Sequence, residues 1–143
     1  MQEIKGELFE QECDAICITT NGSVMKDNKN IMGGDIMGGG CAYQAKEMFE
    51  GLDCVVGKDI LENGLRVFYI KVKKGPFKNL VIFPVKYKIN ENADIGLIVK
   101  SCKELIRITA EKKWTKVIIP RPGCGLGGLK WEDVVMKMMK QVE

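Results

Sequence analysis

The sequence contains no histidine, and this absence removes whole classes of catalytic site. Serine and cysteine hydrolases of the usual kind depend on an imidazole base, so neither arrangement is available to this chain. Zinc sites also draw heavily on histidine. We therefore expect neither a bound metal nor imidazole-dependent hydrolysis.

Long apolar runs and paired cysteine motifs are missing as well. No apolar run is long enough to span a bilayer, and the N-terminal stretch MQEIKGELFEQECD is acidic, without the apolar core of a secretion signal. The cysteines include no CxxC pair and are typical of reduced thiols in a core. We expect a cytoplasmic protein, and its small size and its many lysines and isoleucines favour a bacterial or phage origin. The cysteines are Cys13, Cys17, Cys41, Cys54, Cys102 and Cys124.

The chain also has little excess of one sign of charge over the other. The net charge is only +3 over 143 residues, and lysines and acids are interspersed along the chain. A dedicated nucleic-acid protein usually has a basic face, whereas a protein that binds a small anion needs none. The length is that of one domain, and we expect residues 1–143 to form it.

Strand-like and helical segments alternate along the chain, which predicts an α/β layered fold. Strands are expected at 3–9, 14–19, 65–72, 80–85 and 116–120, the last three covered by helices on both faces. Helices are expected from about Cys41, over about 93–113 and over 131–142, with a weaker helical turn at 58–63. Ligands of such sheets bind outside the carboxyl ends of the strands. The residues of the longest helix that should face the core are Ile98, Cys102, Leu105, Ile106 and Thr109.

Glycine is concentrated in two places, each just before a helix. In PRPGCGLGGLKW four glycines fall within residues 123–128, and a second cluster covers IMGGDIMGGG before Cys41. Free N–H groups at the start of a helix suit an anion, so two such loops indicate a diphosphate. The alternative is that both are tight turns where a helix packs closely on a strand.

Three named motifs fit the second loop poorly. Gly123 to Gly128 has the GxGxxG spacing, but a nicotinamide-binding fold needs a further strand and an acid about twenty residues later, and the chain ends first. A Walker A loop would need Ser or Thr after Lys130, where Trp131 stands. A phosphatase using Cys124 would need an arginine at position 130.

The segments DAICITTN, GGGCAYQAKEMF and IPRPGCGLGGLKWEDV together resemble a macro domain, the ADP-ribose-binding module. The matching segments occur in the same order as in that family and cover nearly the whole chain. Within the family the last segment is most similar to two groups, the terminal ADP-ribose glycohydrolases and the antitoxin enzymes that remove ADP-ribose from DNA thymidine. It implies a three-layer α/β/α fold with a mixed central sheet, and it implies ADP-ribose or an ADP-ribosylated macromolecule as partner. No separate cofactor is implied.

The resemblance also implies binding residues at matching positions. Glu7, with Leu8, would meet the adenine, although the family usually has Asp in the place of Glu7. Asn21 would contact the distal ribose, or else form a turn before Gly22. The first diphosphate loop would be Gly38, Gly39, Gly40 and Cys41, and the second Gly123, Cys124, Gly125, Leu126, Gly127 and Gly128.

Lys86, which follows the strand LVIFPV, matches the catalytic lysine of the glycohydrolase groups. A neutral lysine amine would engage the anomeric carbon of the distal ribose. The alternative is that Lys86 is an ordinary solvated lysine at the end of a strand, of which Lys88 is another example. The protein-directed enzymes have an aspartate where this chain has Gly127, whereas the DNA-directed ones have small residues in this loop. The segment 22–37 is longer than the family's usual first loop and would form a lid or contact the substrate.

These features predict an ADP-ribose-binding domain that hydrolyses ADP-ribose from a modified protein or nucleic acid, with Lys86 as the catalytic residue. A non-catalytic reader of ADP-ribose is the second interpretation. A nucleotide-dependent oxidoreductase that uses the GCGLGG loop comes third, and an ADP-ribose 1″-phosphate phosphatase fourth.

Overall fold

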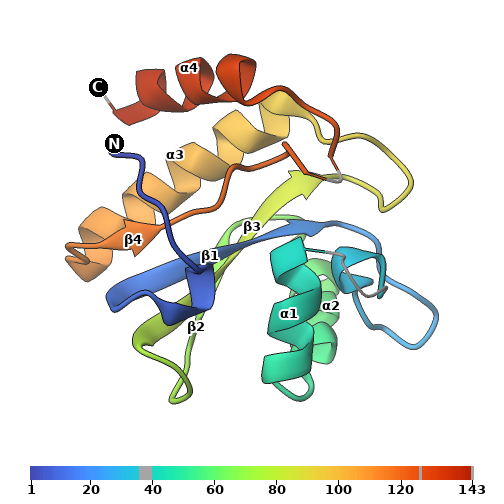
Figure 1. Ribbon diagram of the computed structural model, residues 1–143. Coiled ribbons are helices and arrows are strands. Elements are labelled where there is room, and N and C mark those ends of the chain that lie inside the picture. The colour runs from blue at the N-terminus through green and yellow to red at the C-terminus, as the bar shows by residue number, and fades with distance from the viewer. Residues whose placement is uncertain (36–39, 126, 143) are drawn as a thin grey trace.

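The computed structural model describes residues 1–35, 40–125 and 127–142, with Asp35 described by its backbone alone (Figure 1). A mixed sheet forms its centre, in the order β2-β3-β1-β4. β1 pairs in parallel with β3 and with β4, while β2 is antiparallel to β3. The strands are β1 Cys13–Asn21, β2 Phe68–Lys71, β3 Phe77–Lys86 and β4 Val117–Ile118.

Helices cover both faces of this sheet, as predicted. α3 (Ile95–Lys112) and α4 (Trp131–Val142) lie on one face, and α1 (Gly40–Met48) and α2 (Leu52–Asn63) lie on the other (Figure 1). Each face has its own hydrophobic core, because side chains alternate along a strand. Ala15 and Cys17 of β1 face the core under α3 and α4, whereas Ile16 and Ile18 face the one under α1 and α2.

The predicted inward face of α3 is right in most of its positions. Asp94 caps the helix by accepting a hydrogen bond from the Leu97 N–H at 2.9 Å. Ile98, Cys102 and Leu105 are buried, but Ile106 is 37% exposed and Ile108 is buried in its place. The prediction for Ile106 is therefore wrong, because the stripe that meets the sheet is narrower than the run of apolar residues.

One local prediction is also wrong. Residues 3–9 form no strand: Gly6 has φ 149°, and the chain then enters a short 3-10 turn at Leu8–Glu10. The helical turn predicted at 58–63 is confirmed, and it is the second half of the 12-residue helix α2. A second short turn, Met32–Asp35, precedes α1, with Gly33 and Gly34 at positive φ.

Within the described residues, no helix has the length and apolar character needed to cross a membrane.

Candidate functional site

A cleft of about 220 Å³ lies where β1 and β3 end, between the start of α1 and the loop before α4. The parallel strands β1 and β3 bring their carboxyl ends to the same edge of the sheet, which is where α/β proteins bind ligands. Both glycine regions reach this edge. The lining residues are Thr19, Thr20, Asn21, Gly33, Gly40, Cys41, Ala42, Val85, Lys86, Ile89, Pro120, Arg121, Gly123, Gly125 and Gly127.

The end of β1 supplies three consecutive residues to the cleft. Thr19 approaches Cys41 at the start of α1, with their Oγ1 and Sγ atoms 3.4 Å apart. Thr20 is 3% exposed, and its hydroxyl has no hydrogen-bond partner among the described residues. Buried hydroxyl groups normally find a partner. Thr20 therefore leaves a polar group beside the cleft for a ligand or a water molecule.

Asn21 lines the cleft, but its side chain is engaged within the protein. Its Nδ2 donates to the Ile31 carbonyl at 2.7 Å, and its Oδ1 accepts from the Ser23 N–H at 2.9 Å and from Asn30 Nδ2 at 3.2 Å. Asn21 is 4% exposed. In this structure its amide shapes the chain after β1, and among the described residues one N–H of Nδ2 has a partner and the other has none.

Lys86 ends β3 beside a β-bulge. Thr20 pairs with Pro84 and Asn21 pairs with Lys86, so Val85 is an extra residue in β3. Successive residues of a regular strand point to opposite faces, yet Val85 and Lys86 both line the cleft. Bulges near active sites change the direction of a side chain in this way. The half-buried Lys86 thus lies at the same edge as the glycine loops.

The start of α1 forms one wall. Gly33, Gly40 and Cys41 line the cleft, and the first N–H groups of a helix have no acceptor within it. Gly38 and Gly39, which the resemblance places in the first diphosphate loop, lie outside the described residues.

The second glycine loop forms the opposite wall and is held by its own backbone. The Leu129 N–H donates to the Gly123 carbonyl at 2.9 Å, and the Gly127 carbonyl accepts from the Ala93 N–H at 3.0 Å. Among the described residues, the N–H groups of Gly125 and Gly127 have no partner. They are available to an anion in the cleft.

Close packing also requires glycine in this loop. A Cβ on Gly127 would lie 2.6 Å from the Gly123 carbonyl oxygen and 2.7 Å from the Ala93 Cβ. A Cβ on Gly123, whose φ is 77°, would lie 2.8 Å from the Ile98 side chain. The loop therefore combines both interpretations of its glycines: it packs tightly on α3 and still presents free N–H groups.

The remaining predicted residues of this loop lie differently. Cys124 and Gly128 are not among the lining residues, and Leu126 is outside the described residues. Burial raises the pKa of the Cys124 thiol, although Arg121 opposes this rise. Since a protonated thiol is a poor nucleophile, Cys124 is unsuited to phosphatase chemistry.

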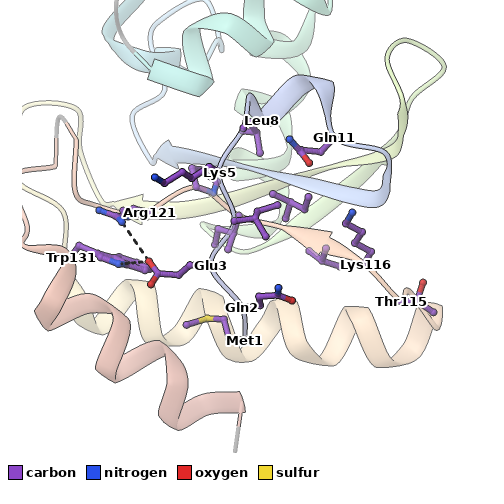
Figure 2. A pocket seen from close by; sticks show the side chains of 16 residues that line it. Met1, Gln2, Glu3, Lys5, Leu8, Gln11, Thr115, Lys116, Arg121 and Trp131 are labelled. Atoms are coloured by element: carbon purple, nitrogen blue, oxygen red, sulfur yellow. Dashed lines mark hydrogen bonds and ion pairs between the residues drawn. The ribbon is translucent and has the colours of Figure 1, made fainter.

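A larger hollow of about 670 Å³ borders the cleft at Pro120 and Arg121. Figure 2 shows the N-terminal segment crossing β4, with Glu3 reaching Arg121 and Trp131. Glu3 Oε1 accepts from Trp131 Nε1 at 2.8 Å and lies 3.5 Å from Arg121 Nη2, while Arg121 stacks over the Trp131 ring. We call these three residues the Glu3 clasp.

Of the predicted adenine-binding pair, one residue lies at this hollow. Leu8 lines it, whereas Glu7 is exposed and lines neither space. The structure thus brings Asn21, Lys86, Gly40, Cys41 and the described glycines of the second loop, except Gly128, into one cleft. It leaves Glu7, Leu8, Cys124 and Gly128 outside.

Sequence reasoning missed Thr20, Ile89 and Arg121. The signal for Arg121 was present, because a cation precedes the second glycine loop by two residues. Thr20 and Ile89 carried no such signal, since they reach the cleft through the bulge and the loop after β3.

Known proteins that resemble this chain bear on its fold. No protein-family profile matches the chain. Two curated relatives, from Mycobacterium tuberculosis and Mycobacterium bovis, are each named DNA ADP-ribosyl glycohydrolase and are 30% identical over 110 residues. The aligned part is 73% of this chain but only 31% of each relative.

Solved structures give a longer match. The macrodomain of Mycobacterium tuberculosis DarG superposes with a TM-score of 0.78 at 24% identity, over 96% of this chain and 86% of that one. The Thermus aquaticus DarG macrodomain gives 0.76 at 22% identity, over 96% and 87%. Thermosipho africanus DarTG, solved in complex with ADP-ribose, gives 0.75 at 19% identity, over 96% and 37%.

Fold and cleft together define the class as a three-layer α/β/α protein with a cleft at the carboxyl ends of parallel strands. Within this class the chain has the macrodomain fold, and the predicted fold is confirmed.

Proposed function

We propose that the cleft binds the diphosphate and distal ribose of ADP-ribose, and that the protein hydrolyses ADP-ribose from a modified macromolecule. One observation carries this proposal: two glycine-containing walls meet at one cleft, and a half-buried lysine lies between them. The free N–H groups of Gly125 and Gly127 suit phosphate oxygens. The name of the curated relatives supports DNA as the first macromolecule to test.

The size of the cleft supports a divided binding mode. Sites for small molecules usually measure about 300–1,000 Å³, and this cleft of about 220 Å³ is smaller. We place the adenosine end beyond Pro120, in the larger hollow that Leu8 lines. In this arrangement Arg121, which borders both spaces, lies beside the diphosphate.

Lys86 is the proposed nucleophile. In its deprotonated form the amine attacks the anomeric carbon, the bond to the macromolecule breaks, and the released group afterwards takes up the proton that the new ammonium nitrogen loses. Water then releases ADP-ribose and restores the amine. A non-catalytic reader is the second candidate, since the tight packing at Gly127 excludes the acid that protein-directed relatives carry there.

Calorimetric titration with ADP-ribose tests binding, with NAD, AMP and ribose 5-phosphate as controls. We expect saturable binding at micromolar concentrations and much weaker binding of the fragments. Hydrolysis is then followed as release of ADP-ribose from a modified oligonucleotide and from a modified protein. The absence of heat and of competition would contradict both candidates, whereas binding without release would leave the reader.

A further inference from the structure

The segment 22–31 is the first part of the segment 22–37, for which a lid or a substrate contact is predicted and of which residues 36 and 37 lie outside the described residues, and it is joined by internal hydrogen bonds. Asn30 is 1% exposed, and its Nδ2 donates to the carbonyls of Asn21 and Ser23, each at 2.9 Å. Val24 and Asn30 form an antiparallel bridge. Because buried amide hydrogen bonds are costly to break, this segment has a fixed shape.

The same segment is attached to α2. The Asn30 N–H donates to the Asp53 carbonyl at 3.0 Å. A Cβ on Gly57 would lie 2.0 Å from the Asn28 carbonyl oxygen, so α2 needs glycine there to accept the loop. The loop is therefore part of the scaffold on this side and not a free lid.

On its other side the loop holds the chain that follows Lys86. Ser23 Oγ accepts a hydrogen bond from the Ile89 N–H at 2.9 Å. A Cβ on Gly22 would lie 2.6 Å from the Tyr87 carbonyl oxygen, which shows how closely the two segments approach. Ile89 itself lines the cleft.

The end of β3 needs such support. Pro84 has no N–H to donate to the ladder, and Val85 is the bulged residue. The Pro84 carbonyl accepts a hydrogen bond from Ser101 Oγ of α3 at 2.7 Å, and the Val85 carbonyl accepts one from the Asp94 N–H at 2.9 Å, so the strand is fixed through the bulge. Lys86 pairs with Asn21 and is the last residue of β3, so the direction of its side chain depends also on where the residues after it are held.

We propose that Ser23 is a positioning residue for Lys86, and that Asn30 anchors Ser23 to the scaffold. The hydrogen bond from the Ile89 N–H to Ser23 fixes the backbone of residues 86–89 next to the bulge. It thereby sets the distance between the lysine amine and the ribose. The catalytic role assigned to Lys86 rests on the proposed function, but the link between Ser23 and Ile89 does not.

The test compares Ser23→Ala with Ser23→Thr, which keeps the hydroxyl. Amide hydrogen exchange is measured in the ligand-free protein, and kcat and KM are measured for release of ADP-ribose. In Ser23→Ala we expect exchange at Ile89 to rise and kcat to fall by about tenfold, the size of effect that one lost hydrogen bond produces. KM should stay within about twofold, because ground-state binding is unchanged. Ser23→Thr should restore both exchange and kcat.

Lys26→Ala, at an exposed position of the same loop, is the matched control and should change neither quantity. Unchanged exchange at Ile89 in Ser23→Ala would overturn the inference, as would equal kcat values for the unaltered protein and Ser23→Ala. Lack of turnover in the unaltered protein would instead contradict the proposed function. Since exchange is measured without substrate, the two failures are read separately.

Discussion

The cleft and the larger hollow beside it differ in how they are built. The cleft is about a third of the size of the hollow, yet it is made of paired strand ends, a bulge and glycine loops, and backbone hydrogen bonds hold both the bulge and the second loop. The hollow is bounded by the N-terminal segment, which the Glu3 clasp holds; two of its three side chains, Glu3 and Arg121, are more than half exposed. If cavity volume were the only criterion, the hollow would be chosen as the candidate site.

If the protein has the proposed function, this difference separates two tasks of one binding surface. Chemistry needs groups fixed to within a fraction of an ångström, and such precision comes from buried networks on rigid elements. Affinity for the remote end of a ligand tolerates a looser wall. We therefore expect substitutions in the cleft to change turnover and stability, and substitutions around the hollow to change affinity slightly.

The largest expected effect is that of Lys86→Ala. Removal of the nucleophile should lower the rate of ADP-ribose release by at least about 10²-fold, while calorimetry should show little change in ADP-ribose affinity. Lys88→Ala, at the exposed lysine two residues later, is the control. If the variant without Lys86 kept the full rate of release, catalysis would not take place in the cleft through Lys86.

Gly127→Ala comes next. The new methyl group would collide with the Gly123 carbonyl and Ala93, so we expect a loss of about 1–3 kcal/mol in the free energy of unfolding and weaker ADP-ribose binding. Gly125→Ala is the matched control in the same loop, because a Cβ there has nothing within 4 Å. Thermal melting checks both, and equal melting temperatures would show that the loop is not tightly packed.

Asp14→Asn should have a moderate, pH-dependent effect. Hydrogen bonds from the Lys116 and Thr115 N–H groups lower the pKa of Asp14 below its ordinary 3.8. A lowered pKa in the folded state means that the carboxylate stabilises the fold above its ordinary pKa, and that this contribution is lost as the pH falls through the folded-state value.

Urea unfolding at a series of pH values checks this sign. Asp14→Asn should unfold at lower urea concentration than the unaltered protein near neutral pH, and the difference should shrink as the pH falls below 3.8. Glu12→Gln, two residues earlier and exposed, should show no such trend. A difference that grows on acidification would refute the assignment.

The smallest effect is expected for Glu3→Gln in the clasp. The Arg121 and Glu3 side chains are 63% and 62% exposed, and exposed pairs contribute little. ADP-ribose affinity should change by no more than about twofold, and the change should disappear at high salt. A tenfold change in affinity would mean that the clasp, and not only the cleft, fixes the ligand.

The layers of the fold and most of its helices and strands could be predicted from the sequence. Helix α3 and strand β3 were predictable because their apolar periodicity reflects burial directly. Residues 3–9 were not, since a weak alternation does not reveal that Gly6 turns the chain. Helix α2 was predicted only in its second half, because Gly57, which lies against the 22–31 loop, stands in the middle of its helical pattern.

The site was predictable where glycine or lysine stood in a recognisable pattern. What could not be predicted was the pairing of Asn21 with Lys86, because a bulge changes side-chain direction without a local sequence signal of its own. The role of Asn30 was hidden for a similar reason: an asparagine in a polar loop is typical of a turn, and only the fold reveals that it is buried.

The crowding at Gly127 bears on which bonds the proposed enzyme can break. No carboxylate lines the cleft among the described side chains, and the packing around Gly127 excludes one there. A departing group must then leave without a proton delivered by a neighbouring acid. Weakly basic leaving groups, such as a nucleobase imide or a carboxylate, meet this requirement, whereas an alkoxide does not. The selectivity of the protein would thus be set by the basicity of what it releases as much as by the shape of what it holds.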